Sequence, residues 1–244
     1  MTAQRELTAK MEPFDSFWEG PDNIEKGYTS LYKFYKYNYL PHMPEDKSVN
    51  VLVISCGPGY FVDMLNRNGY HKVLGIDSFA DKIRHATDHK LNCIQADAFE
   101  HLENSDMPYD VIFCEQELNH LTKDEIIDFL QLAWSKMTPG GTLIAHALNG
   151  ANPITGAEAL AQNFDHYNTF TEYTMKQVME HTNFENTTVI PLHLYVFWTN
   201  PLNYALILMS ALYTAFFRIS FIMYGKKNKI FTKKIAAICN KPAA

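Results

Sequence analysis

The chain has 244 residues, of which 47% are hydrophobic and 20% are charged, so it can bury a sizeable globular core. Its net charge of −6 at pH 7 argues against a general nucleic-acid-binding protein, which would usually be basic. The charge is uneven, because every charged residue after Phe217 is basic. We therefore expect no nucleic-acid partner, and a C-terminal end that faces an anionic partner or a membrane surface.

The four cysteines are isolated along the sequence, and they form neither a C-x-x-C motif nor a zinc-ligand spacing. We expect reduced, buried thiols in a cytoplasmic protein, and the N-terminal sequence MTAQRE contains no apolar signal region. No pair of acids accompanies a histidine in a metal-ligand pattern, so a metal-independent reaction is the default expectation. The cysteines are Cys56, Cys93, Cys114 and Cys239.

Residues 1–48 are rich in aromatic side chains. Leu31, Tyr35 and Tyr39 recur at helical spacing, and prolines at positions 41 and 44 end the predicted helix. Such a helix either only caps the core or also forms a lid over a bound ligand, and the sequence leaves both open.

The run VLVISCGPGYFV at residues 51–62 predicts a buried strand, a tight glycine turn and a helix. Gly57 and Gly59 let a ligand approach the backbone, and the first amides of the helix can hold a carboxylate. The turn is not a dinucleotide fingerprint, because Val62 stands where the third glycine would fall and Pro58 lacks a backbone donor. A nicotinamide-dependent oxidoreductase is therefore disfavoured.

Two further predicted strands end close to an acid. Residues 72–77 end at Asp77, 20 positions after Gly57, where a carboxylate can accept hydrogen bonds from two ribose hydroxyls. Residues 91–96 precede Asp97, which can also cap a helix at 98–104.

The alternation of strands and helices continues beyond this point. Residues 109–115 predict a central fourth strand, and a Thr-x-x-Glu capping box at Thr122 places a helix at 123–137. A Pro-Gly-Gly turn at 139–141 then precedes a fifth strand at 142–149. Five strand–helix repeats are typical of an α/β protein with a doubly wound, mostly parallel sheet that carries helices on both faces.

The order and spacing of these segments resemble the motifs of the class I, Rossmann-like S-adenosylmethionine-dependent methyltransferases. Ser55 departs from the acidic or glycine residue that the family often carries there. The resemblance implies a seven-stranded sheet and S-adenosylmethionine as cofactor, with Asp77 at the ribose and Asp97 at the adenine amino group. The cofactor-binding residues that it implies are Ser55, Cys56, Gly57, Gly59, Tyr60, Asp77, Ser78, Asp97, Ala98 and Glu115.

The resemblance also implies a division of the chain. We expect an N-terminal helical cap or lid at 1–48 and a methyltransferase core at 49–196. An apolar helical insertion at 197–229 then precedes the final strand and tail at 230–244.

Residues 204–224 form a long apolar segment whose only charge is Arg218, and by length it could span a bilayer. If residues 230–239 form the last strand of the sheet beside strand 187–196, both ends of the segment lie on one side of a membrane, which excludes a single span. Peripheral membrane contact through 201–229, a homodimer contact and a cap on the core remain open. In the first case the protein would lie at the inner face of the membrane.

Two histidines are candidates for catalysis. His120 follows the fourth strand, at the sheet edge where ligands bind, and a histidine can remove the proton of an acceptor hydroxyl. His166, beside Asp165, is the second candidate, whereas His146 lies inside a strand and is expected to be packed.

The segment at 163–171 resembles methyltransferases of bacterial surface-polysaccharide biosynthesis. This resemblance implies methyl transfer to a hydroxyl on a sugar of a surface or lipid-linked glycan. The first alternative is O-methylation of a lipophilic small molecule such as a quinone precursor. The second is a non-catalytic cofactor-binding scaffold.

Overall fold

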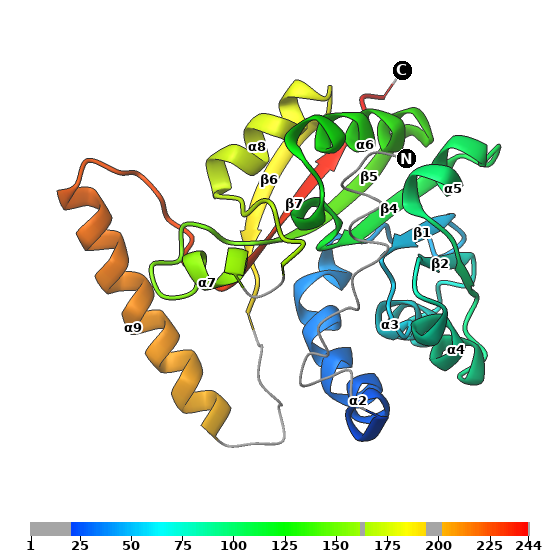
Figure 1. The fold of residues 1–244 in the computed structure, drawn as a ribbon, viewed down its shortest axis with the longest axis horizontal. Helices are drawn as coiled ribbons and strands as arrows, with labels where there is room; N and C mark the ends of the chain where they lie inside the picture. The colour runs from blue at the N-terminus through cyan, green and yellow to red at the C-terminus, as the bar shows by residue number, and fades with distance from the viewer. Residues whose placement is uncertain (1–20, 162–163, 194–201, 244) are drawn as a thin grey trace.

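A computed structural model describes residues 21–161, 164–193 and 202–243. A twisted seven-stranded sheet forms its centre and helices cover both faces (Figure 1). The strand order is β3-β2-β1-β4-β5-β7-β6, with β1 to β5 parallel and β7 antiparallel to both of its neighbours. The predicted fold class, an α/β methyltransferase-like sheet, is confirmed.

Apart from the starts of β5 and β7, the strands lie close to their predicted positions. They are β1 (Val51–Ile54), β2 (Val73–Asp77), β3 (Cys93–Gln95), β4 (Tyr109–Glu115), β5 (Met137–Leu148), β6 (Glu185–Pro191) and β7 (Lys234–Asn240).

Helices connect and flank these strands. In chain order they are α2 (Pro21–Asn38), η1 (Leu40–His42), α3 (Tyr60–Arg67), α4 (Ala80–Asp88), α5 (Ala98–Asn104), η2 (Glu117–His120), α6 (Lys123–Ser135), α7 (Gly156–Ala161), α8 (Glu172–His181) and α9 (Leu202–Met223).

The central strands are apolar on both sides because each side packs against helices. In β1, Leu52 and Ile54 belong to the core beneath α5, α6 and α8, whereas Val51 and Val53 belong to the core beneath α2, α3 and α4. A strand buried on both faces reads as a continuous apolar run, which explains the sequence VLVI. All four cysteines are buried and unpaired.

β5 begins earlier than predicted. The sequence placed a Pro-Gly-Gly turn before a strand at 142–149, but in the structure these residues belong to β5, which starts at Met137 beside Tyr109. The amides of Gly140 and Lys241 bond to the carbonyls of Lys241 and Gly141, so the glycine pair is held against the chain that leaves β7. Long-range pairing therefore extends the strand through residues that locally favour a turn.

The final strand has its predicted place in the sheet, but it begins at Lys234, four residues after the predicted start at residue 230. β7 inserts between β5 and β6, with Ala237 opposite both Ala145 and Val189. The predicted strand at 187–196 corresponds to β6, and its last three residues lie outside the described part of the chain.

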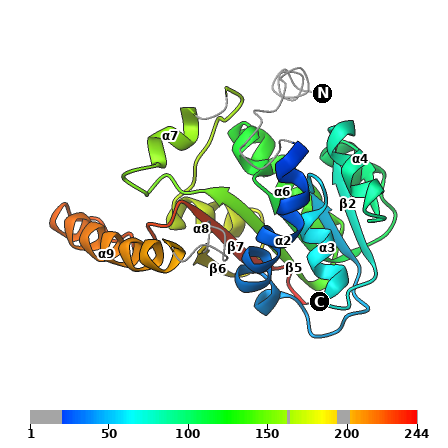
Figure 2. The ribbon, with the colours of Figure 1, turned by 90° about the horizontal axis from the view of Figure 1, so that it is seen from below.

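α9 lies along one side of the molecule and projects away from the sheet in both views (Figures 1 and 2). Its Phe217 and Phe221 rings contact Phe231, and the carboxylate of Glu172 holds the amides of Lys229 and the next residue. Most of its large apolar side chains are exposed, so the predicted alternative of a cap on the core is wrong. None of the helices in the described ranges is long and apolar enough to cross a membrane.

Candidate active site

The loop between β1 and α3 has the geometry of a ligand cradle. Ser55, Gly57 and Gly59 all have positive φ angles, of 55°, 55° and 85°. A Cβ at Gly59 would lie 2.7 Å from Cδ1 of Leu91, whereas a Cβ at Gly57 would meet nothing within 4 Å. The two glycines thus have different tasks, because Gly59 allows tight packing and Gly57 borders open space.

Asp77 anchors this loop from the end of β2. Its Oδ2 accepts the amide of Gly57 at 2.9 Å, and its Oδ1 accepts the amide of Phe79 at 2.9 Å. The carboxylate is buried and its position relative to the loop is fixed, which fits a group that binds a ligand beside Gly57. Ser78, the next residue, is exposed.

Asp97 caps α5, as the sequence allowed. Its Oδ1 accepts the amides of Phe99 and Glu100, both at 3.0 Å, and α5 spans the predicted residues 98–104. Ala98 is buried at the start of this helix. Because β1, β2 and β3 are parallel neighbours, Asp97 lies at the same edge of the sheet as Asp77 and the glycine loop.

Glu117 also belongs to this edge, and the sequence analysis missed it. The hydroxyl of Ser55 donates to Oε2 of Glu117 at 2.5 Å. Burial raises the pKa of Glu117, and the nearby carboxylates of Asp97 and Asp77 add to the rise. The signal that could have revealed it was the missing acid at position 55, combined with the pairing of β1 and β4.

Glu115 contacts the N-terminal helix and β5. Its Oε2 accepts the hydroxyl of Tyr35 at 2.7 Å, and its Oε1 lies 3.3 Å from Nδ1 of His146. Burial lowers the pKa of His146 to about 4, so this packed histidine is neutral at pH 7. Burial alone would raise the pKa of Glu115, but His146, Lys234 and Tyr35 together lower it. Its role toward a cofactor stays a prediction.

α2 closes over the glycine loop. The hydroxyl of Tyr28 donates to the carbonyl of Pro58 at 2.5 Å, and the hydroxyl of Tyr60 donates to the carbonyl of Ile24 at 3.0 Å. Gly27 allows this approach, because a Cβ there would lie 2.4 Å from the Tyr60 ring. The helix therefore covers the loop directly, as both a cap and a lid would.

The structure brings the two predicted catalytic histidines together. Nδ1 of His120, at the end of η2, lies 3.0 Å from Oδ2 of Asp165, and the His120 and His166 ring centroids are 4.7 Å apart. Burial alone would raise the pKa of Asp165, but the hydrogen bond and charge of His120 outweigh it and lower that pKa. Burial lowers the pKa of His166.

Asn119, fully buried and also missed from the sequence, holds this arrangement in place. The side-chain Nδ2 of Asn119 donates to the backbone carbonyl of Asn168 at 2.6 Å. The backbone carbonyl of Asn119 accepts the amide of Tyr167 at 2.8 Å. Its Oδ1 accepts the amide of Leu148 at 3.2 Å. One side chain thus ties η2, β5 and the 164–170 loop together.

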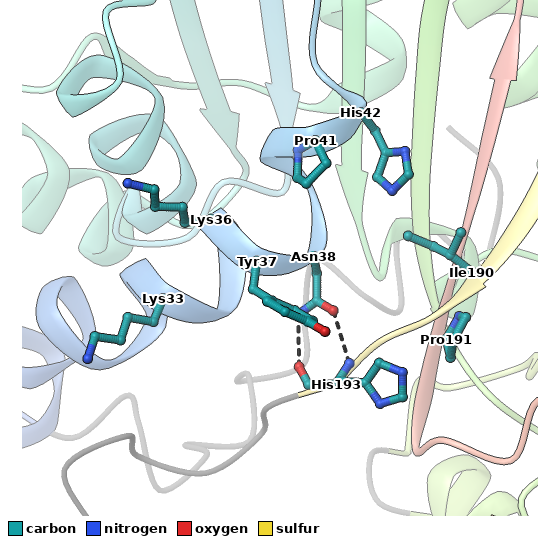
Figure 3. A pocket seen from close by; sticks show the side chains of 9 residues that line it. All are labelled: Lys33, Lys36, Tyr37, Asn38, Pro41, His42, Ile190, Pro191 and His193. Atoms are coloured by element: carbon teal, nitrogen blue, oxygen red, sulfur yellow. Dashed lines mark hydrogen bonds between the residues drawn. The ribbon is translucent and has the colours of Figure 1, made fainter. Parts of the chain in front are cut away.

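A separate groove of about 770 Å³ lies between α2, η1 and β6, and it contains none of the predicted site residues. Asn38 joins its walls, because its Nδ2 and Oδ1 bond to the backbone of His193 at 2.8 and 3.0 Å. The side chains of Lys33 and Lys36 point away from Ile190 on the opposite wall (Figure 3).

Comparisons with known proteins agree with this geometry. A family model described as a methyltransferase domain matches residues 30–189, and no curated protein matches the chain. The fold is similar to an S-adenosylmethionine-dependent methyltransferase from Archaeoglobus fulgidus, with 19% identity, 89% of this chain and 99% of that chain covered, and a TM-score of 0.64.

Two further solved structures show the same likeness in fold. One is described as a possible histamine N-methyltransferase from Thermotoga maritima, with 13% identity, coverage of 92% and 97%, and a TM-score of 0.61. The other is phosphoethanolamine N-methyltransferase 2 from Haemonchus contortus in complex with S-adenosyl-L-methionine, with 13% identity, coverage of 96% and 61%, and a TM-score of 0.57. Because the family model covers more than half of the sequence, the chain belongs to the methyltransferase-domain family and is an S-adenosylmethionine-dependent methyltransferase.

Proposed function

We propose that the protein transfers the methyl group of S-adenosylmethionine to a hydroxyl oxygen, with His120 as the group that accepts the hydroxyl proton. The observation that carries this proposal is the 3.0 Å contact between His120 and Asp165 at the sheet edge. His120 is three residues from Glu117, whose carboxylate bonds to the glycine loop. A hydroxyl is a poor nucleophile, so a base close to the methyl donor favours this reaction class.

The residues present fit the cofactor. Asp77 would hold the ribose hydroxyls, Asp97 and Ala98 the adenine, and Gly57 leaves room beside the backbone. Glu117 would replace the acid that the family often carries at position 55 and would bind the cofactor's ammonium group. When bound, S-adenosylmethionine supplies the electrophilic methyl group. The remaining members of the proposed set are Ser55, Cys56, Gly59, Tyr60, Ser78 and Glu115.

The His120–Asp165 pair defines the direction of proton transfer. Because the pKa of Asp165 is lowered, its carboxylate is ionised and accepts a hydrogen bond from the Nδ1–H group of His120. This tautomer leaves the electron pair of His120 on Nε2, which is the atom that would take the acceptor's proton. Asp165 is a positioning residue in this scheme.

A sugar of a surface or lipid-linked glycan is the proposed acceptor. Phe164 and Tyr167 flank Asp165 and His166, and their side chains are 79% and 43% exposed. Exposed aromatic rings beside a polar base suit a sugar, which offers apolar faces and hydroxyl edges. The alternative acceptor, a lipophilic small molecule, would equally explain the exposed apolar α9.

The proposal includes a peripheral membrane contact at the inner face of the membrane. The exposed apolar side chains of α9 are followed by Lys226, Lys227 and Lys229, all exposed. An apolar helix face next to lysines suits the interface of an anionic bilayer. A homodimer through the same surface is the alternative. The exposed apolar side chains of α9 are Ile207, Leu208, Met209, Leu212, Tyr213, Phe216, Ile219, Ile222 and Met223, and the exposed Tyr224 follows directly after the helix.

The decisive experiment uses purified protein, methyl-labelled donor and fractionated extract of the source cells. The proposal expects label in the glycan fraction, release of a methylated sugar on hydrolysis, and loss of labelling with His120→Gln. Label in a small organic-soluble compound would instead identify a lipophilic acceptor. If neither fraction is labelled although the protein binds the donor, the non-catalytic scaffold replaces the proposal.

A further inference from the structure

His120, Asp165 and His166 form a compact set of metal ligands. One ligand atom from each side chain lies within 4.8 Å of those from the other two. Two histidines and a carboxylate form a ligand set that binds divalent transition metals such as Zn²⁺. The sequence analysis did not group these residues as metal ligands, because His120 lies 45 positions before Asp165.

The ring of His166 is held in a metal-binding orientation. Its Nδ1 lies 2.7 Å from the carbonyl oxygen of Ala159, which can only accept, so Nδ1 carries the proton. Nε2 is then the nitrogen with the in-plane electron pair. Metal-binding histidines usually donate their second ring N–H in this way.

The two ligand segments are also fixed relative to each other. Asn119 precedes His120 and bonds to the backbone of Tyr167 and Asn168, directly after the other two ligands. A metal with bonds of about 2.1 Å in a tetrahedral site needs its ligand atoms about 3.4 Å apart. Small side-chain movements would reach this spacing without moving the backbone that Asn119 holds.

We propose that His120, Asp165 and His166 bind one divalent transition-metal ion of the Zn²⁺ type, and that the bound ion inhibits methyl transfer. The inhibitory part rests on the proposed function, because the ion would occupy His120 and replace its hydrogen bond to Asp165. Three protein ligands leave a coordination position for water, as in open zinc sites. Methyl transfer itself would then require the metal-free state.

Metal binding is tested first, on the full chain after treatment with a chelator. We expect Co²⁺ to bind with one ion per chain, to give the visible spectrum of a four-coordinate site, and to be displaced by Zn²⁺. His166→Gln and Asp165→Asn should each abolish this spectrum, whereas His71→Gln, at an exposed histidine elsewhere, should retain it. Thermal unfolding of each metal-free variant at the same temperature as the unmodified protein shows that the variant folds. If only one of His166→Gln and Asp165→Asn folds, that variant alone suffices for the test.

Methyl transfer is then measured in the same preparations. The proposal expects activity to fall in proportion to metal occupancy and to return when a chelator is added. Absence of a site-specific spectrum, or one that survives both variants, would overturn the metal site. If the metal binds while activity is unchanged or rises, the inhibitory role is wrong. If His120→Gln loses the spectrum but retains full transferase activity, the proposed base falls while the metal site stands.

Discussion

The hydroxyl of Ser55 donates a 2.5 Å hydrogen bond to Oε2 of Glu117, so an acid from the loop after β4 stands at the end of β1. The two residues are brought together by the parallel pairing of Ile54 with Cys114. Gln116, with a φ of 60°, turns the chain so that Glu117 begins η2. Glu117 therefore places a carboxylate beside position 55, although it comes from the segment that follows β4.

Glu117→Gln should weaken cofactor binding and stabilise the cofactor-free protein. Loss of one charged contact to the ammonium group should raise the Kd for S-adenosylmethionine about tenfold or more. Folding raises the pKa of Glu117, so its ionisation destabilises the fold once the pH exceeds the unfolded value of about 4.3. Calorimetric titration and urea unfolding at pH 7 measure the two effects. Glu103→Gln, an exposed change on α5, is the control, and unaltered cofactor affinity would contradict the assignment.

His120→Gln should lower kcat about 100-fold, with little change in cofactor affinity, because only proton removal is lost. Asp165→Asn should lower kcat as well, since an amide can donate to Nδ1 and favour the wrong tautomer. Steady-state kinetics with parallel binding measurements separate these effects. His71→Gln should behave as the unmodified protein. Full activity of His120→Gln would rule out the proposed base.

Gly57→Ala and Gly59→Ala form a matched pair with different expected outcomes. Both residues have positive φ, which costs a residue with a side chain about 1–2 kcal/mol. Gly59→Ala adds a 2.7 Å contact with Leu91, so it should lose more free energy of unfolding. Gly57→Ala fills the open space, so it should lose more cofactor affinity. Urea unfolding compares the stability of the two variants, and calorimetry compares their cofactor affinity. If Gly57→Ala loses more stability and Gly59→Ala loses more affinity, Gly57 does not border the cofactor.

His146 should make the protein sensitive to acid. Folding lowers its pKa from 6.5 to about 4, so the unfolded chain binds a proton that the folded chain excludes. The protein keeps its full free energy of unfolding above about pH 6.5 and loses part of it, through protonation of His146 in the unfolded chain, as the pH falls toward 4. Between pH 7.5 and pH 5 the loss is on the order of 2 kcal/mol. His146→Gln should reduce the loss and His71→Gln should not, as urea unfolding at both pH values would show.

The surface of α9 should bind anionic vesicles. Replacing Lys226, Lys227 and Lys229 together by glutamate should weaken binding by about 100-fold or more, at about 1 kcal/mol for each lysine lost. Phe216→Asp should weaken it through the apolar face. Flotation with anionic and with neutral vesicles measures both changes. Protein that stays in the soluble fraction with every vesicle would contradict membrane contact, and a dimer in sedimentation experiments would then identify the alternative.

Local patterns were sufficient for much of the fold. The capping box of Thr122 and Glu125 and the cap formed by Asp97 depend on residues a few positions apart, and both are present. The pairing of β7 with its neighbours also agrees with the sequence interpretation. The two caps are visible within a short window of sequence, whereas the pairing of β7 joins distant segments and was expected from the family resemblance.

The parts that were missed depend on distant segments meeting. The Ser55–Glu117 bond requires that β1 and β4 are neighbours, and the position of Asp165 beside His120 requires the contacts of Asn119. Neither of these two contacts can be predicted from the spacing of residues along the chain. The early start of β5 was missed for the same reason, because its glycines favour a turn until Lys241 pairs with them.

The place of β7 in the sheet has a consequence for the order of folding. β5 and β6 do not pair with each other, since Lys234–Asn240 lies between them. During synthesis, β5 therefore keeps an open edge until residues 234–240 have been made, while β1 to β4 can already pair. Open strand edges invite wrong pairing, so this interval is when a nascent chain most needs protection from aggregation.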